Sequence, residues 1–587
     1  MRRIRRCLSL LPLLLVPALG HAGVQLVVDG VDDPLKAAVT AGVSLSQYAT
    51  RDVSEAQVHR LYDRAGEEAN QALRPYGYYE AHTTGKLEQV GKDWRITLHV
   101  VPGEPVKVTS VDIQLDPTAA ALRPIRATRR GIEKLKGQRL DDTAYDAARD
   151  ALNNALTANG YLDAKLTVRR VEVNRGEHSA AIHLAWDVGR RYRYGEVRFE
   201  GSQFQPAFLD RYIPFKPGDY FDQNQLLTLQ QALNGADYFS AVNVIPETDK
   251  ARDGVVDIRV QLAPAKRRIY TAGLFVGTDT GVGVRGGVEY RWINRYGHKW
   301  KNDVVLAQRL KTVTSQYSIP LAGGNQRSLN FGVTYRDANT VTSQSRTLEL
   351  VANESELWHD WVRTVGVHAL TGTFSVGKRP NEPESTPGVE HGHSTLIYAE
   401  GSLSRKAADN FDFVRRGWSL NFDARSTAGD LLSTARFSEV MASGKWIRSF
   451  WRTNRLILRG DLGHVWTSNF EALPPQLRFF AGGDQSIRGY AYQAVGPQNS
   501  YGRVIGGNSL VIASATLEHY FTPRWGIATF VDAGNAFNDV NVHPKIGTGI
   551  GVRWRSPVGL IRVDVGTPIN DAQHHGVELH LVIGPDL

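Results

Sequence analysis

The chain has 587 residues, a formal net charge of +9 and a single cysteine, Cys7. This mild positive charge, without a block of Lys and Arg interleaved with aromatic residues, argues against a nucleic-acid-binding surface. Beyond the first 22 residues no stretch reaches about 18 consecutive apolar residues, so we expect no membrane-spanning helix. A membrane role would therefore require a β-barrel, whose strands give a weaker signal in a sequence.

The N-terminus predicts export. Four arginines within residues 2–6 precede an apolar run over 8–19, and small residues follow up to Ala22. This pattern is typical of a secretory signal peptide over 1–22 and is too short for a stable membrane anchor. Loss of the four arginines would lower the formal charge from +9 to +5. Because Cys7 lies in the signal, the exported chain should contain no disulfide and should depend on core packing or a closed sheet.

Three stretches of the N-terminal half resemble one another. Aligning Tyr78, Tyr161 and Tyr238 also aligns an alanine three positions later, and the spacings are 83 and 77 residues. A helical pattern precedes each tyrosine and two alternating segments follow it, so each unit reads as strand, helices, strand, strand. We expect the tyrosines to be core residues. An unpaired edge of such a small sheet can accept another chain by strand addition.

From residue 267 the sequence becomes a series of short segments with period-two alternation. In 455–466, for example, Leu456, Leu458 and Leu462 share one face, whereas Arg455 lies on the other. We count sixteen such segments: 267–276, 281–293, 299–309, 312–320, 326–337, 344–357, 360–376, 393–405, 416–426, 431–442, 452–463, 508–521, 524–534, 545–555, 558–566 and 575–583.

The predicted fold is therefore α+β repeats followed by an all-β domain. A soluble sandwich also alternates, but the export signal, the even strand number and the missing cysteine favour a sixteen-stranded antiparallel transmembrane barrel. The predicted boundaries are 1–22 for the signal peptide, 23–103, 104–189 and 190–264 for the repeats, and 265–587 for the barrel, with a long inward-folding loop at about 464–507.

The long loop contains the segment AGGDQSIRGY, and a loop of this length is usually functional or disordered. Arg488 suits an excursion into a polar lumen, where it would need an acidic partner. Asp532 shares one face of a later strand with Phe530 and Gly534, and Glu518 offers a second acid one strand earlier. A solvated surface loop with an unrelated lumen acid is the alternative.

The last predicted strand, 575–583, contains Gly576 and is followed by Gly584 and Pro585. Glycine weakens a strand and proline cannot donate a ladder hydrogen bond. We therefore expect a weak seam between the first and last strands, with ordinary strand termination as the alternative. The expected seam residues are Gly576, Leu579, Leu581, Gly584 and Pro585.

IRGY in a long late loop, FVDAG on a following strand and repeats ahead of a barrel together resemble the BamA/TamA superfamily of outer-membrane assembly proteins. The repeats resemble polypeptide-transport-associated (POTRA) domains, and the resemblance covers essentially the whole exported chain. Three repeats, sixteen strands and the ending LHLVIGPDL are most similar to its TamA-type members.

The resemblance implies that the loop folds into the lumen and braces the wall beside the seam, as a structural latch and not as a catalyst. The implied latch residues are Arg488, Gly489 and Tyr490, and the implied receptor residues are Phe530, Asp532, Gly534 and Glu518.

The resemblance also implies a function without enzymatic activity, cofactor, metal or nucleic acid. The chain would be the insertase subunit of a translocation and assembly module in the outer membrane of Gram-negative cells, in contact with outer-membrane lipid. Its periplasmic repeats would bind a TamB-type, inner-membrane-anchored partner, and its clients would be unfolded β-barrels such as autotransporters. A two-partner secretion transporter that exports a protein through its lumen is the main alternative, and a passive porin or receptor barrel is a weaker one.

Overall fold

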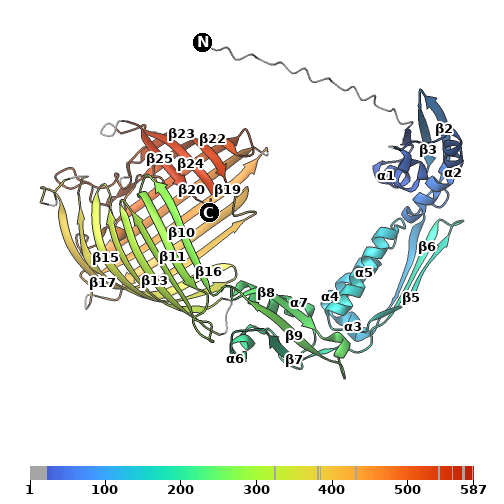
Figure 1. Cartoon of the computed structure of the whole chain (residues 1–587), viewed down its shortest axis with the longest axis horizontal. Coiled ribbons are helices and arrows are strands. Elements are labelled where there is room, and N and C mark those ends of the chain that lie inside the picture. Colours follow the sequence, from blue (N-terminus) through green and yellow to red (C-terminus); the bar gives the residue numbers. More distant parts are fainter. Residues whose placement is uncertain are drawn as a thin grey trace, which may run out of the picture. The chain divides into compact units, whose positions relative to one another are not determined.

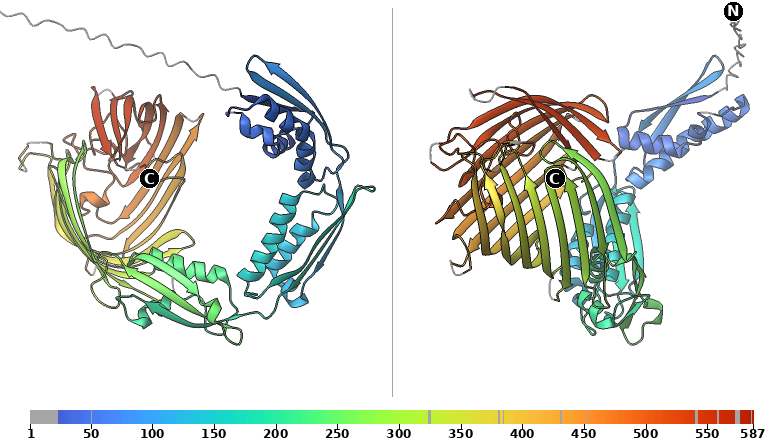
Figure 2. Two further views of the ribbon diagram at one scale, coloured as in Figure 1. Left: turned by 45° about the vertical axis from the view of Figure 1, so that its right-hand side comes forward. Right: turned by 60° about the vertical axis from the view of Figure 1, so that its left-hand side comes forward.

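The computed structural model describes residues 23–49, 51–322, 326–379, 382–383, 385–429, 432–451, 453–539, 542–557, 559–571, 576–584 and 586–587 (Figures 1 and 2). The predicted signal peptide lies outside these residues. The chain forms two compact units: one contains the residues up to Val197 with Phe215–Leu226 and Pro246–Ile258, and the other contains Arg198–Pro214, Leu227–Ile245 and Arg259–Leu587. None of the described helices is both long enough and apolar enough to cross a membrane.

The first repeat consists of β1 (Val24–Asp29), α1 (Asp33–Gly42), η1 (Ser44–Tyr48), α2 (Glu55–Leu73), η2 (Arg74–Tyr76), β2 (His82–Val90) and β3 (Asp93–Val101). The second consists of β4 (Lys107–Gln114), α3 (Pro117–Ala121), α4 (Arg123–Glu133), α5 (Asp142–Ala158), β5 (Lys165–Asn174) and β6 (Ser179–Asp187). The third consists of β7 (Arg193–Glu200), α6 (Pro206–Leu209), η3 (Asp210–Tyr212), α7 (Gln223–Gly235), β8 (Phe239–Pro246), η4 (Thr248–Lys250) and β9 (Val255–Pro264).

Each repeat has one three-stranded sheet with the same topology. The orders are β1-β3-β2, β4-β6-β5 and β7-β9-β8, and the last strand of each repeat is central. In the first two sheets the opening strand runs parallel to this central strand. The predicted core positions Tyr161 and Tyr238 are buried, and Tyr78 is half-buried against the first core. The domain boundaries remain predictions.

The C-terminal domain is one sheet of sixteen strands in sequential order, which confirms the predicted fold class. Its strands are β10 (Arg268–Gly277), β11 (Gly281–Tyr290), β12 (Lys299–Ala307), β13 (Leu310–Pro320), β14 (Ser328–Asn339), β15 (Ser343–Trp358), β16 (Trp361–Val376), β17 (Glu390–Ala408), β18 (Arg416–Thr427), β19 (Phe437–Phe450), β20 (Asn454–Thr467), β21 (Ser509–Tyr520), β22 (Trp525–Phe537), β23 (Lys545–Ser556), β24 (Gly559–Pro568) and β25 (Glu578–Ile583). The sheet forms the curved wall in Figure 1.

The tenth strand differs most from its predicted range. The tenth strand was expected at 431–442, but β19 begins at Phe437 and continues to Phe450. Residues 443–450 keep their ladder with β20, and Trp446 is exposed on the same face as Val440. The alternation therefore continues past the small residues at which the prediction ended the strand.

The two faces of the wall differ as the alternation predicts. Along β20, Leu458 and Leu462 are exposed, whereas Arg455 is 1% exposed. Apolar side chains thus face outward, and charged side chains face a lumen. In a membrane-spanning barrel, this arrangement places apolar residues against lipid.

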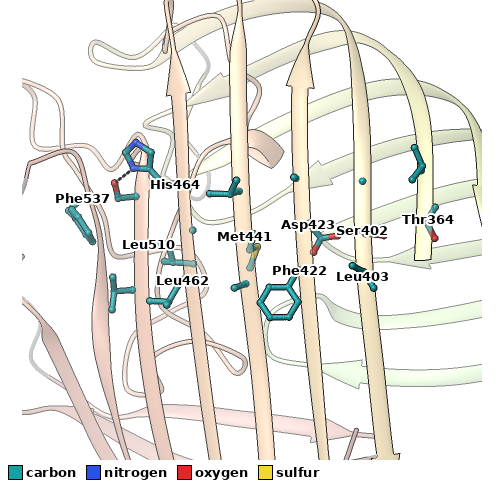
Figure 3. Close-up of a pocket in the computed structure, with 18 of the residues that line it drawn as sticks. Thr364, Ser402, Leu403, Phe422, Asp423, Met441, Leu462, His464, Leu510 and Phe537 are labelled. Atoms are coloured by element: carbon teal, nitrogen blue, oxygen red, sulfur yellow. Dashed lines mark hydrogen bonds between the residues drawn. The ribbon is translucent and has the colours of Figure 1, made fainter. Parts of the chain in front are cut away.

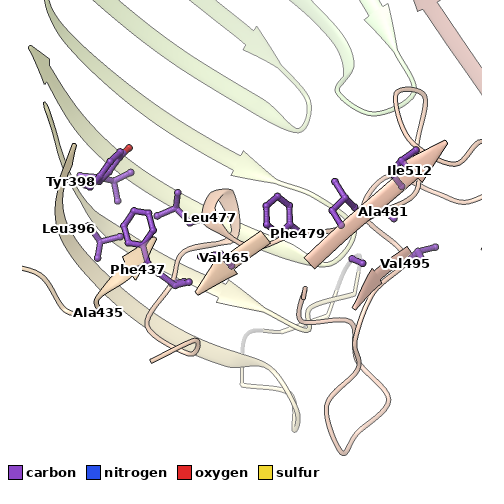
Figure 4. Packing of buried hydrophobic residues seen from close by; sticks show 14 of the residues in the cluster. Leu396, Tyr398, Ala435, Phe437, Val465, Leu477, Phe479, Ala481, Val495 and Ile512 are labelled. Carbon is purple, nitrogen blue, oxygen red and sulfur yellow. The ribbon is translucent and has the colours of Figure 1, made fainter. Parts of the chain in front are cut away.

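The loop 468–508 between β20 and β21 contributes to the interior. It contains η5 (Pro475–Leu477), and buried apolar residues of the loop pack against inward side chains of the wall (Figure 4). Phe479 and Val495 from the loop join Leu396, Phe437 and Ile512 from the wall in one core cluster. The loop therefore fills part of the lumen as a small apolar core.

Within the barrel-containing unit, part of the third repeat packs on the turn that connects β11 and β12. The Tyr238 hydroxyl donates to the Gly297 carbonyl (2.5 Å), and the Phe208 ring lies where a Cβ on Gly297 would be. Gly297 also has a φ of 74°, which favours glycine. Position 297 of this turn therefore requires glycine.

We predict that Gly297→Ala loosens this packing, because the new methyl group overlaps the Phe208 ring and the backbone is left-handed. Overpacking of this kind costs about 1–3 kcal/mol. Hydrogen exchange of residues 204–212 should become faster. Gly273→Ala is the matched control, since a Cβ there meets nothing within 4 Å; equal exchange in both variants would contradict the prediction.

Candidate functional site: the lumen latch and the seam

Arg488 of the long loop lies in the lumen, 7% exposed, and binds the wall through several groups. Its Nε and Nη2 donate to the two carboxylate oxygens of Asp532 at 2.7 and 2.8 Å, and Nη2 also donates to the Thr516 hydroxyl at 2.8 Å. Nη1 donates to Asp564 at 2.9 Å. The guanidinium lies over the Phe530 ring, 3.6 Å from its centre. The structure therefore brings Arg488 together with Asp532 and Phe530.

Glycines allow the loop backbone to approach the wall. Gly489 has a φ of 97°, a Cβ there would lie 2.8 Å from Thr567, and its N–H donates to His580 Nε2 at 2.9 Å. In β23, a Cβ on Gly547 would overlap the Arg488 carbonyl oxygen. Substitution at either glycine would push the loop away from the wall.

Two other predicted residues lie beside this contact. Tyr490 is 1% exposed and belongs to the apolar cluster of loop and wall residues that contains Phe479 and Val495, which we call the loop core cluster. Gly534 shares the inward face of Asp532, and a Cβ there would overlap the Val511 carbonyl oxygen.

Glu518 belongs to the same region but is not a direct partner of Arg488 among the described contacts. It accepts from Arg553 Nε at 2.6 Å and from Arg455 Nε at 2.8 Å. The register explains this, because Asp532 pairs with Ser514, which precedes Glu518 on β21 by two inward-facing positions. Arg553 in turn binds Asp564 at 2.5 Å, and Asp564 binds Arg488.

The chain of ion pairs continues to the C-terminal tail. Arg455 Nη1 lies 2.5 Å from Asp586, which also accepts from Arg562 at 2.7 Å, and Lys445 Nζ donates to the Asp586 carbonyl at 2.6 Å. We call this set the lumen ion chain; in order its members are Asp532, Arg488, Asp564, Arg553, Glu518, Arg455, Asp586 and Arg562.

The lumen ion chain has four carboxylates and four guanidinium groups, so it is balanced in charge. Burial lowers the pKa of Arg488, but its hydrogen bonds to Asp532 and the charge of Asp564 raise it by more. Burial raises the pKa of Asp586, and the charges of Arg455 and Arg562 lower it by more. Both groups therefore stay ionised, and removal of one member would leave a buried, unpaired charge.

The seam lies between β10 and β25, the two ends of the sixteen-stranded sheet. Among the described residues no β-ladder joins them, and β25 has six residues against ten in β10. A backbone-to-side-chain bond crosses here, from the Leu581 N–H to the Thr278 hydroxyl (3.3 Å). Leu579 and Leu581 lie in β25, where Leu579 is exposed.

The last strand is shorter than predicted. Gly576 has a φ of 138° and precedes β25, which begins at Glu578, so the strand does not contain this glycine. The left-handed backbone of Gly576 prevents an extended ladder at that point. Gly584 follows the strand end at Ile583, and Pro585 lies outside the described residues.

The loop also ties both sides of the seam together. The Asp484 carboxylate accepts from the Thr278 hydroxyl (2.6 Å) and lies 2.7 Å from His580 Nδ1. The Asp484 backbone N–H donates to the Asp279 carboxylate at 3.3 and 3.4 Å. We call Thr278, Asp279, Asp484 and His580 the seam clasp. Burial and the nearby charge of Asp484 raise the pKa of Asp279 to about 7.

Sequence reasoning missed most of these partners. Asp564 and Arg553 are charged residues flanked by apolar neighbours on predicted strands, so strand parity could have assigned them to the lumen. No periodic signal marks Asp484 or Asp586, because they lie outside strands.

A concavity of about 910 Å³ lies across β16–β22 (Figure 3). Its outward side chains include Phe422, Val440 and Leu462, which are exposed on the face opposite the lumen. The hydrogen bond between His464 and Ser509 (2.8 Å) is its main polar contact in Figure 3. Arg363, Asp423 and Asp539 are among its lining residues, but most of its lining is apolar, and the concavity is part of the wall surface.

Repeats with a single small sheet, followed by a sixteen-stranded barrel whose lumen holds a latched loop, define a class of β-barrels that carry N-terminal α+β repeats. Residues 278–585 match the Omp85 superfamily domain, and the chain belongs to this superfamily. Residues 25–102 match POTRA domain TamA domain 1, and 192–263 match the surface antigen variable number repeat, a POTRA-type family. The family assignment locates the barrel in the outer membrane and the repeats in the periplasm.

Among curated proteins, the chain is similar to outer membrane protein assembly factor BamA of Nitratidesulfovibrio vulgaris strain Hildenborough. The two are 22% identical over 439 residues, which cover 71% of this chain and 54% of the relative. The chain thus spans about half the length of this relative.

Among solved structures, BamA from Haemophilus ducreyi lacking POTRA domains 1–3 has a TM-score of 0.66 at 18% identity, covering 81% of this chain and 98% of that chain. This likeness shows a common fold. CdiB from Acinetobacter baumannii has a TM-score of 0.47 at 13% identity, covering 81% of this chain and 88% of that chain.

We predict that Arg488→Ala destabilises the barrel by about 3–5 kcal/mol, because it leaves Asp532 buried without its cation and removes one of the two cations that bind Asp564. Asp532→Ala should act similarly. The measurement is the temperature at which the folded barrel loses its fast mobility on a gel. Arg363→Ala, which removes an exposed pair with Glu356 (2.7 Å), should cost at most about 1 kcal/mol. Wild-type heat stability of both lumen variants would reject the latch.

We also predict a pH dependence of the seam clasp. Since the pKa of Asp279 is raised to about 7, the clasped state holds a proton that the open state releases from about pH 4 upward. The clasp is therefore strongest at acidic pH and weakens as pH rises through about 7. The other charged or titratable groups near Asp279 are Asp484, His580, Arg309 and Tyr492.

The substitution Asp279→Asn removes this pH-dependent contribution to the stability of the seam clasp. The difference in barrel melting temperature between pH 5 and pH 8 should shrink relative to the wild type. An unchanged difference would show that Asp279 is ionised throughout this range.

Proposed function

We propose that the chain is the outer-membrane insertase subunit of a translocation and assembly module, exported by its N-terminal signal peptide. It would assist the folding, insertion and secretion of β-barrel clients such as autotransporters. The observation that carries this proposal is the seam, where β10 and β25 form no ladder among the described residues.

The physical basis is the cost of unpaired backbone groups. In hydrocarbon each unsatisfied N–H or C=O costs several kcal/mol. The edge of β10 is therefore a template to which a client strand can add, and the client relieves that cost as it pairs. Tyr270 and Leu274 of β10 are exposed on the outer face and would continue into the apolar face of the client. The free energy would come from client folding, so the function needs neither catalysis nor a cofactor.

Because the lumen is filled, we favour a route for the client through the seam in the barrel wall over a route through the lumen. The loop core cluster and the lumen ion chain occupy interior space that an exported polypeptide would need. Clearing it would leave several buried charges without partners. A two-partner secretion transporter would have to meet this cost, whereas opening at the seam leaves the latch in place.

We further propose that the first repeat binds a TamB-type, inner-membrane-anchored partner. The match of residues 25–102 to the first POTRA domain of TamA supports this, and so do the sheet edges β1 and β2, which can accept a strand. Truncation of residues 23–103 should then abolish partner co-purification while the barrel still folds.

A disulfide across the seam tests the insertase. We predict that Gly277→Cys with Leu581→Cys, scanned over neighbouring registers, locks the seam and stops client assembly, and that reduction restores it. A Cβ at Gly277 would lie 3.8 Å from the Leu581 carbonyl oxygen, so the two chains are close enough to scan. The only natural cysteine, Cys7, lies in the predicted signal.

The matched control is Leu274→Cys with Val284→Cys, which joins two strands that are already paired opposite each other. This lock should leave assembly unchanged. If clients pass a locked seam as well as the control, the route is the lumen, and the secretion-transporter function replaces the insertase.

A further inference from the structure

A cavity of about 790 Å³ lies inside the barrel-containing unit, where the third repeat packs on β12–β15. We call it the repeat-side pocket. One wall is formed by η3, α7 and Tyr238, and the other by the repeat-side ends of the four strands. Its volume is in the range of pockets that hold a ligand, which is about 300–1,000 Å³.

The strand side chains that line the pocket face away from lipid. Lys299, Ser318 and Asn330 lie opposite one another on β12, β13 and β14, and Asn330 is buried. Their strand neighbours Trp300 and Phe331 are exposed on the outer face. A ligand of this pocket therefore comes from the aqueous lumen or periplasm and not from the bilayer.

Two cations in the pocket form no ion pair within 4 Å among the described residues, although the charges of Asp237 and Glu289 act on one of them, Lys299. Arg211 uses one of its five N–H donors, from Nη1 to the Pro320 carbonyl (2.9 Å), and its Nε is buried without a hydrogen-bond partner. Lys299 Nζ donates to the Ala236 carbonyl (2.9 Å) and lies 4.6 Å from the centre of the Tyr238 ring. Both side chains thus keep donors available.

The rest of the lining does not neutralise this charge. The third cation, Arg327, is already bound to Glu354 through two hydrogen bonds of 2.8 and 3.1 Å. No Asp or Glu is among the described residues that line the pocket. Amide and hydroxyl groups supply the remaining polarity, from side chains such as Gln316 and Ser328.

The two cations and the neutral amide and hydroxyl groups together determine which class of ligand the pocket can bind. An arginine with free donors binds a carboxylate in a two-point geometry, a lysine adds a point charge, and side-chain amides match the donors and acceptors of a peptide backbone. Half-buried cations that form no ion pair lose part of their hydration, so a bound anion stabilises the pocket.

We propose that the repeat-side pocket binds an acidic, extended polypeptide segment, with Arg211 and Lys299 holding its carboxylates. The identity of the ligand as a polypeptide rests on the proposed function. The pocket would hold a client segment at the barrel entrance before its strand reaches the seam.

The test is binding of a short fluorescent peptide rich in aspartate to the full chain in lipid nanodiscs, measured by anisotropy at low and high salt. The controls are the same peptide with asparagine in place of aspartate, and inorganic phosphate as competitor. We expect the acidic peptide to bind and the asparagine peptide to bind at least about tenfold more weakly, since hydrogen bonds to charged groups are the strong ones.

Arg211→Gln and Lys299→Gln should each weaken the acidic peptide about tenfold, as expected for loss of a charged hydrogen-bond donor. Lys301→Gln is the matched control, because Lys301 faces the lumen on the same strand but lies outside the pocket. Arg211→Lys, which keeps the charge, should retain part of the binding, and gel mobility confirms folding of every variant.

Equal binding of the acidic peptide to wild type, Arg211→Gln and Lys299→Gln would overturn the proposal. So would displacement of the peptide by phosphate at equal concentration, which would make this a phosphate site. The seam disulfide distinguishes the two proposals: it should stop assembly and leave peptide binding intact, so either result can fail without the other.

Discussion

Buried charge is the constraint on which the rest of this barrel depends. A guanidinium such as Arg488 cannot lie in the lumen without carboxylates, and one of the two carboxylates that it binds, Asp564, also binds Arg553. The sequence of pairs from Asp532 to Asp586 satisfies this requirement in one connected chain. Since its members come from a loop, several strands and the C-terminal tail, no one of these segments can move alone at low cost.

Because of the lumen ion chain, the strands are connected to their neighbours unequally around the barrel. Strands β20–β24 are joined by ladders and also by the buried ion pairs, and β25 is joined to them through His580 and the Asp586 tail. The first strand, β10, has its ladder to β11. On its other side the described residues form no ladder, and the Thr278–Asp279 turn bonds to Leu581 and Asp484. The weakest lateral connection of the wall is therefore the one that strand addition would use.

The alternation of inward and outward side chains along each strand, here called strand parity, explains how far the sequence could predict this architecture. A charged residue between outward apolar residues points to the lumen, which is why Arg488, once taken as an inward loop residue, could be matched to Asp532. The sixteen strands follow from the same period, and β19 was displaced because small residues interrupt its apolar alternation near Ser443. Parity gives the face but not the height along the strand, so Glu518 was assigned to Arg488, whereas it binds Arg455 and Arg553.

Contacts made outside regular structure had no such signal. Asp484 and Asp586 lie in a loop and a tail, and their partners are hundreds or tens of residues away, so only the closed barrel brings them together. The same holds for Arg211 and Lys299, which line one pocket but come from a helical turn of the third repeat and from a barrel strand. In this chain, the curvature of the sheet into a barrel creates these sites, because it brings charged side chains together where they are buried from water.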